Sequence, residues 1–112
     1  MITAIVQFKL PQPLTIAEAA QRFEMSAPKY RNLPGLVRKY YLLSEDGSTG
    51  GGVYLWETRE AAERVYNGEW RERIEKLYGA KPMIAWFSSP VIVDNSDSEQ
   101  PQPTANRAVG AR

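Results

Sequence analysis

Apolar side chains follow two periodicities along this chain, and together these periodicities predict its elements. Four segments are rich in β-branched and aromatic residues and favour strands, namely residues 2–9, 36–44, 51–57 and 82–93. The stretches between them repeat apolar residues at helical spacing: Ile16, Ala19, Ala20, Phe23 and Ala27 first, then Ala61, Ala62, Val65, Trp70, Ile74, Leu77 and Tyr78. The predicted order is therefore strand, helix, strand, strand, helix, strand.

Residues with helix-end preferences bound both helical stretches: Thr15 with Glu18 as a capping box, Thr58 as an N-cap and Gly79 as a C-cap. Pro28 is expected to kink or restart the first helix, because proline lacks a backbone N–H. Asn67 and Gly68 are expected to break the second helical stretch in two.

The order of elements predicts an α+β, ferredoxin-like fold with a four-stranded antiparallel sheet and helices on one face only. Both faces of the predicted strands nevertheless carry large apolar groups. On the second strand, one face receives Leu36, Arg38, Tyr40 and Leu42, and the other receives Val37, Lys39, Tyr41 and Leu43. An apolar face without a helix over it must meet another molecule. We therefore expect a homodimer that packs sheet against sheet.

Composition changes at Asp94 and predicts a domain boundary there. Residues 94–112 contain no aromatic residue and few apolar ones. Such a segment buries too little surface to offset its ordering entropy, so we expect a disordered C-terminal tail after a folded domain at residues 1–93. A docking peptide around residues 100–103 is the alternative. Pro90 is expected to mark a bulge or a crossing to the sheet edge within the last strand.

Charge and residue counts exclude several classes of function. The chain has 112 residues, with 14 Lys and Arg against 13 Asp and Glu, which gives no electrostatic reason to expect nucleic acid or an acidic membrane as partner. It contains no cysteine and no histidine, which excludes thiolate nucleophiles, imidazole bases, and thiolate or imidazole metal sites. No segment is typical of a signal peptide or a membrane span, so we expect a cytoplasmic protein.

Polar residues inside predicted strands are candidates for a site, because burying an unpaired polar group is costly. These residues are Gln7, Arg38, Lys39 and Ser88. Aromatic side chains near them could stack on a flat ligand: Tyr30, Tyr40, Tyr41, Tyr54, Trp56 and Trp86. The alternative is that these rings belong to the core and a dimer interface. The glycines at 50–52 precede a strand and not a helix, which argues against a phosphate site.

Several segments resemble one known family. They are Pro34-Gly35-Leu36, Arg38-Lys39-Tyr40-Tyr41, Gly51-Gly52-Val53-Tyr54-Leu55-Trp56 and Pro90-Val91-Ile92-Val93-Asp94. With the order of elements, they resemble the YdhR-type monooxygenases of the dimeric α+β barrel superfamily, which includes the antibiotic-biosynthesis monooxygenases. The resemblance covers about residues 1–95. It implies a monooxygenase that oxidises a hydroxylated aromatic or polycyclic phenol with dioxygen, without metal, flavin or other cofactor.

The resemblance also implies site residues in a cavity between sheet and helices. It favours a polar residue on the first strand and a tryptophan ending the third, matched by Gln7 and Trp56. Tyr54 is expected to share the face of Trp56, together with Arg38 and Tyr40. Arg38 would stabilise the substrate anion, Tyr40 would relay a proton, and Gln7 would complete the catalytic set. The expected substrate-binding residues are Trp56, Tyr54, Trp86 and Tyr30.

The sequence departs from the wider superfamily at two points. Heme-degrading relatives bind iron through a helical histidine, and this chain has none, so that activity is not expected. Gln7 stands where an asparagine is usual and is one methylene longer. Two other functions stay open. One is a non-catalytic dimer that binds an aromatic or lipophilic molecule, and the other is a lactone isomerase or decarboxylase on the same fold.

Overall fold

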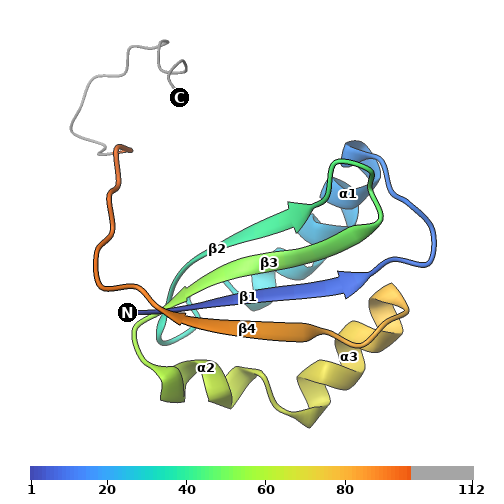
Figure 1. Ribbon diagram of the computed structural model, residues 1–112. Coiled ribbons are helices and arrows are strands. Elements are labelled where there is room, and N and C mark those ends of the chain that lie inside the picture. The colour runs from blue at the N-terminus through green and yellow to red at the C-terminus, as the bar shows by residue number, and fades with distance from the viewer. Residues whose placement is uncertain (97–112) are drawn as a thin grey trace.

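Four strands form one antiparallel sheet, and helices cover one of its faces (Figure 1). The computed structural model describes residues 1–96. The strands are β1 (Ile2–Lys9), β2 (Leu36–Leu43), β3 (Thr49–Trp56) and β4 (Met83–Ser88), in the spatial order β2-β3-β1-β4. The helices are α1 (Ile16–Ser26), the short 3₁₀ helix η1 (Ala27–Lys29), α2 (Arg59–Val65) and α3 (Gly68–Tyr78). The predicted ferredoxin-like α+β order is confirmed.

The predicted helix ends are confirmed as well. Thr15 Oγ1 accepts a hydrogen bond from the backbone N–H of Glu18 at 3.1 Å, and the Glu18 carboxylate accepts one from the N–H of Thr15 at 2.9 Å. Thr58 Oγ1 accepts from the backbone N–H of Ala61 at 3.1 Å. Gly79 ends α3 in the left-handed conformation, with φ of 86°. Before Pro28, α1 ends at Ser26 and the chain continues as η1.

The hydrophobic core lies between the sheet and the helices. Its strand residues are Ala4, Val6, Phe8, Tyr54 and Trp56, and its other residues include Ala61, Ala62, Trp70, Ile74 and Tyr78 of the helices and Tyr66 between α2 and α3. Trp56 is completely buried. Since α2 and α3 supply most of the second layer, the face of β1 and β3 that carries these residues is the covered face of the sheet.

A β-bulge near the start of β2 changes which residues face the helices. Leu36 lies opposite Trp56, but Arg38 lies opposite Leu55, so the register shifts by one residue between them. A one-residue shift moves every later side chain to the other face. Lys39 therefore lies opposite Tyr54 on the covered face. Strict alternation had placed Leu36 on the same face as Arg38 and Tyr40, and that prediction is wrong, because the bulge puts Leu36 on the face of Lys39.

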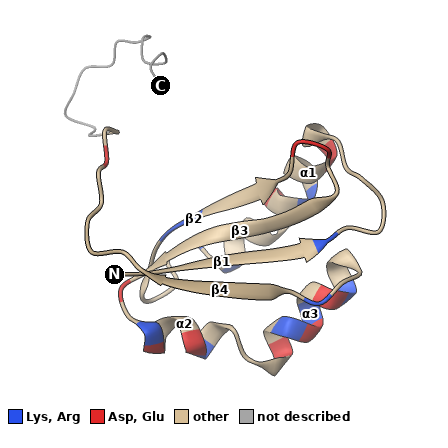
Figure 2. Ribbon diagram, viewed as in Figure 1, with Lys and Arg blue, Asp and Glu red and all other residues tan. Residues whose placement is uncertain are grey.

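The opposite face of the sheet has no helix over it in the part of the chain that the structure describes. Its largest exposed side chains are Tyr40, Met83 and Phe87, which are 55%, 74% and 54% exposed. Figure 2 shows the charged residues concentrated on the helices, whereas the strands are largely uncharged. The predicted apolar uncovered face is thus present, and the dimer that would cover it stays a prediction.

The last strand is shorter than predicted. β4 ends at Ser88, and residues 89–96 have no regular structure and leave the sheet (Figure 1). The backbone N–H of Ser89 still donates to the carbonyl of Met1 at 2.9 Å, but Pro90 has no N–H with which to continue the ladder. Most of the predicted tail, residues 97–112, lies outside the described residues, so the boundary at Asp94 stays a prediction. No helix within residues 1–96 combines the length and apolar character needed to cross a membrane.

Candidate functional site

A lysine side chain lies among three tyrosine rings on the covered face of the sheet. Lys39 Nζ is 3.4 Å from the ring centroid of Tyr30, 3.8 Å from that of Tyr41 and 4.5 Å from that of Tyr54. Tyr30 directly follows η1, Tyr41 lies on β2 and Tyr54 on β3. The negative faces of such rings attract an ammonium. We call Lys39 and these three tyrosines the lysine cage.

Lys39 has no carboxylate partner within residues 1–96. The ion pairs in this part of the chain join Arg38 to Asp94 and Arg59 to Glu63. Ring faces compensate only in part for the lost water, so burial lowers the pKa of Lys39 from 10.5 to about 7. Near neutral pH, Lys39 is therefore divided between a neutral amine and an ammonium.

Hydrogen bonds and stacking hold the tyrosines of the cage in place. Trp70 Nε1 donates to the hydroxyl of Tyr30 at 2.9 Å, and the hydroxyls of Tyr41 and Ser26 are hydrogen-bonded at 2.7 Å. Tyr54 stacks on Trp56 with the ring planes 5° apart. Burial raises the pKa of Tyr41 and of Tyr54, so these two hydroxyls stay protonated at neutral pH.

Glycine at position 52 makes room for the lysine side chain. A Cβ at this position would lie 3.1 Å from the carbonyl oxygen of Tyr40, 3.2 Å from Lys39 Cε and 3.2 Å from Tyr54 Cε1. Such contacts are tight, so an alanine here would press on both side chains. We expect Gly52→Ala to displace Lys39 and weaken the binding of an aromatic ligand about tenfold, which equilibrium titration with 2-naphthol would measure. Unchanged affinity would show that the ligand does not reach the cage.

Two spaces adjoin the lysine cage. A small cavity of about 30 Å³, room for little more than water, lies between the sheet and the helices. A groove of about 520 Å³ lies between α1, η1 and β2, a volume typical of small-molecule sites. Both spaces are lined by Phe23, Tyr30, Lys39 and Tyr41. An aromatic molecule in the groove would therefore meet ring faces and Lys39 together.

Among the predicted substrate-binding residues, the structure brings Tyr30 and Tyr54 together in the lysine cage. Trp56 shares the face of Tyr54, as expected, and stacks on its ring. It lines neither the cavity nor the groove. Trp86 lies on the same face at β4, the opposite edge of the sheet from β2. There it packs on Tyr66 and carries the Arg59 guanidinium 3.8 Å from its ring centroid.

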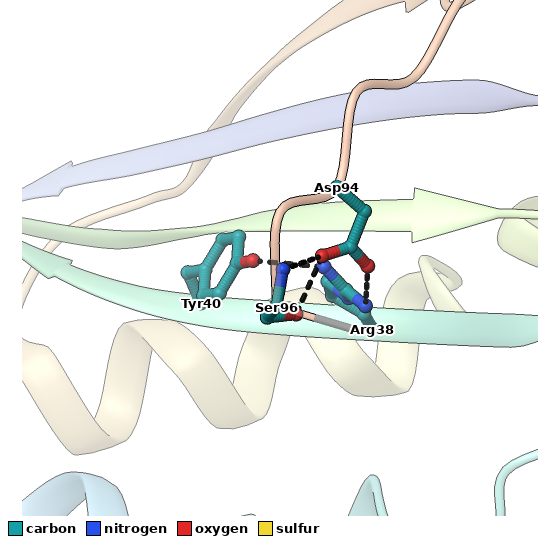
Figure 3. A network of polar contacts seen from close by, with 4 residues as sticks. All are labelled: Arg38, Tyr40, Asp94 and Ser96. Carbon is teal, nitrogen blue, oxygen red and sulfur yellow. Dashed lines mark hydrogen bonds and ion pairs between the residues drawn. The ribbon is translucent and has the colours of Figure 1, made fainter. Parts of the chain in front are cut away.

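The predicted catalytic residues lie apart from the lysine cage. The guanidinium of Arg38 donates to the Tyr40 hydroxyl at 3.2 Å and to the Asp94 carboxylate at 2.9 Å (Figure 3). The N–H of Ser96 also donates to Asp94, and these hydrogen bonds, those of Ser96 first, lower the pKa of Asp94 to about 2. Arg38 lines part of the groove, but this network is exposed to solvent. The expectation that Arg38 and Tyr40 share the face of Trp56 is wrong, because the bulge turns them to the uncovered face.

Gln7 also lies on the uncovered face. It is exposed and stands in register between Gly51 on β3 and Met83 on β4, whereas its neighbours Val6 and Phe8 are buried against the helices. The amide of Gln7 therefore points away from the cavity between sheet and helices in which the resemblance had suggested it would act.

Lys39 was among the polar strand residues that the sequence offered as candidates, but the sequence assigned it no role in the site. It was recognisable as a charged residue within a predicted strand, next to the Arg38 that was chosen instead. Its position depends on the bulge, which adds one residue without changing the pattern of residue types. Within residues 1–96, no three Asp or Glu side chains gather into a cluster that could hold a metal ion.

Comparison with known proteins identifies one family whose model matches this chain. The family described as "Putative mono-oxygenase ydhR" matches residues 4–82, which include most of β1, all of β2 and β3, and every residue of the lysine cage. No curated protein matches the chain.

Solved structures with the same fold include several oxygenases. SnoaB, a cofactor-independent oxygenase from Streptomyces nogalater, is 18% identical with a TM-score of 0.60, over 82% of this chain and 95% of that one. The ActVA-Orf6 monooxygenase of Streptomyces coelicolor, in complex with nanaomycin D, is 20% identical with a TM-score of 0.62, over 82% and 89%. A Deinococcus radiodurans protein that carries the description "putative antibiotic biosynthesis monooxygenase" is 11% identical with a TM-score of 0.62, over 84% of this chain and 97% of that one. Identities this low show a shared fold.

Proposed function

Because this chain belongs to the ydhR family of mono-oxygenases, we propose that it is a cofactor-independent monooxygenase acting on a hydroxylated aromatic small molecule. The observation that carries the proposal is the groove whose lining includes Tyr30, Lys39 and Tyr41 of the lysine cage. Its ring faces suit a flat aromatic substrate, and Lys39 suits an oxygen that becomes negative. Tyr30 and Tyr41 would bind the substrate directly, while Tyr54 and Trp56 would fix the inner wall.

The proposed reaction converts a phenol with a hydrogen at its para carbon, plus dioxygen, into a para-quinone and water. The phenolate supplies the electrons. A carbon–oxygen bond forms at the para carbon, the oxygen–oxygen bond breaks, and the second oxygen atom leaves as water. The phenol loses four electrons and dioxygen gains four. The protein has to promote loss of the phenolic proton, hold the resulting anion and keep water away from it.

We propose further that two copies pair through their uncovered sheet faces. Exposed apolar side chains such as Tyr40, Met83 and Phe87 support this pairing. The interface would then include Gln7, Arg38 and Tyr40, which lie on the uncovered face. Trp86 would pack on β4, at the edge of each sheet opposite β2. The wild-type protein is expected to sediment as a dimer, and Phe87→Lys as a monomer, because a lysine in the centre of an apolar interface is costly. A wild-type monomer at micromolar concentration would contradict the pairing.

Oxygen uptake tests the proposed activity. Protein freed of metal and flavin would be mixed with dihydroxynaphthalenes, anthrones and related phenols, and dissolved oxygen followed with an electrode. Folded protein is expected to consume one dioxygen per quinone formed, and heat-denatured protein none above the spontaneous rate. Absence of uptake across the panel would contradict the monooxygenase proposal.

Ligand binding without turnover is a second candidate, favoured by the small volume of the cavity beside the lysine cage. Its volume of about 30 Å³ is too small for an aromatic ring, so the ring would lie in the open groove, where water is not excluded from a phenolate. A binding protein would take up a phenol and consume no oxygen. Equilibrium titration beside the oxygen measurement separates the two functions.

A further inference from the structure

We infer that Lys39 takes the proton of a bound phenol and then stays beside the phenolate as its counter-ion. This inference rests on the proposed function and names the acidic group that the site recognises. It assigns both deprotonation and anion stabilisation to one side chain, whereas sequence analysis had divided them between Arg38 and Tyr40.

The placement of Lys39 supports this role. Lys39 lines both the small cavity and the open groove, so a ligand in the groove would lie against it. Gly52 leaves the space that the lysine stem occupies. The ring centroids of Tyr30 and Tyr41, both within 4 Å of Nζ, restrict the amine to a narrow position. A restrained amine at the end of a groove is suited to meet a single hydroxyl.

The electrostatic surroundings leave this amine free to accept a proton. Burial keeps the pKa of Lys39 near 7, so much of it is unprotonated just above neutral pH. No carboxylate within residues 1–96 pairs with the ammonium, so its charge is available to an incoming anion. Phenolate and ammonium then stabilise each other, which lowers the pKa of the phenol and raises that of Lys39.

Other titratable and charged groups near Lys39 come from four elements. They are Tyr41 on β2, Tyr54 on β3, Lys29 and Tyr30 in and after η1, and Arg73 and Tyr78 on α3. The groove adds Glu24 of α1, Arg31 and Arg38. Glu24 is exposed and forms no ion pair within residues 1–96, and the remaining groups are cations or tyrosines. This excess of positive charge favours an anionic ligand.

The proton step is balanced by itself. The O–H bond of the phenol breaks, an N–H bond forms on Nζ, and the products are a phenolate and the Lys39 ammonium. No electron is transferred in this step. When dioxygen has added to the substrate, the ammonium returns its proton to the peroxide anion, and Lys39 is again a neutral amine.

Binding of 2-naphthol without oxygen tests the inference. At about pH 8 this phenol is neutral in water, while Lys39 is mostly unprotonated. The wild-type protein is expected to give the absorbance band of naphtholate, with no net release of protons to the buffer. Lys39→Met is expected to bind naphthol in its neutral form, with the naphtholate band reduced at least tenfold. A pH-indicator dye would measure the proton balance.

Two further variants separate the chemical role from a structural one. Lys39→Arg supplies a permanent cation that cannot accept a proton at this pH, so naphtholate should form with about one proton released per ligand bound. Lys76→Met, on the exposed side of α3, serves as the control and should match the wild type. Circular dichroism would confirm that each variant is folded.

Three results would overturn the inference: neutral naphthol bound to the wild type, an equal naphtholate band in Lys39→Met, or no binding of naphthol at millimolar concentration. The proposed function fails separately. If naphtholate forms but no phenol causes oxygen uptake, the monooxygenase proposal is contradicted and the role of Lys39 in binding stands. If oxygen uptake persists in Lys39→Met, the role of Lys39 is contradicted and the monooxygenase proposal stands.

Discussion

Lys39→Met is expected to melt at a higher temperature than the wild type at neutral pH, although it removes a residue central to the site. Lysine in the unfolded chain has a pKa of 10.5, and burial lowers that of Lys39 to about 7. Between these two pKa values, the lysine is protonated in the unfolded state and largely neutral in the folded state. This difference in proton binding lowers the free energy of unfolding by about 4 kcal/mol at pH 7. Loss of the ring contacts offsets part of the gain, so we expect a net increase of about 1–3 kcal/mol.

The dependence on pH gives this prediction a second readout. The penalty from Lys39 is complete below about pH 7 and disappears as the pH rises towards 10.5. The stability of the wild type should therefore rise over this range relative to that of Lys39→Met, until the two converge. Thermal unfolding at pH 6, 8 and 10 would measure both curves. A less stable variant at pH 7, or parallel curves, would contradict the burial of Lys39 as described.

Gly51→Ala is expected to destabilise the protein by about 3 kcal/mol or more. A Cβ at this position would lie 1.9 Å from the carbonyl oxygen of Val6 and 2.9 Å from its carbonyl carbon. Both atoms belong to the backbone of β1, which pairs with β3 at this point, so no side chain can rotate to relieve the clash. The two strands would have to move apart, and this movement would also displace their core residues Val6 and Tyr54.

Gly68→Ala is the matched control for this substitution. Gly68 begins α3, and a Cβ there would have no atom within 4 Å. Alanine is a better helix residue than glycine, so we expect an unchanged or slightly higher stability, by up to about 1 kcal/mol. Denaturant unfolding of both variants would compare them directly. Equal effects of the two substitutions would contradict the close approach of β3 to β1.

Local patterns in the sequence were sufficient for much of the fold. The capping box of Thr15 and Glu18 and the terminal Gly79 depend on neighbours within a few residues, and both occur as predicted. Alternation along β3 correctly placed Tyr54 and Trp56 on one face, because this strand has no bulge between them. The open sheet face likewise followed from helices that cover only one side.

The site depends on features that these patterns do not contain. The bulge between Leu36 and Arg38 adds one residue, and its position is determined by how β2 pairs with β3. It moved Lys39 to the covered face and Arg38 and Tyr40 away from it. The cage also depends on a contact between segments that are separate in the sequence, because Tyr30 directly follows η1 and reaches Lys39 only through the packing of α1 and η1 on the sheet. Pro90 ended β4 earlier than its apolar neighbours indicated.

Oxygen consumption by the wild type and Lys39→Met, measured side by side on a dihydroxynaphthalene, tests most directly the claim that phenol oxidation takes place at the lysine cage. We expect the wild type and the control Lys76→Met to consume oxygen equally. Lys39→Met should be slower by roughly 100-fold or more, as is usual when a general base is removed. Equal rates in the wild type and a folded Lys39→Met would contradict the claim.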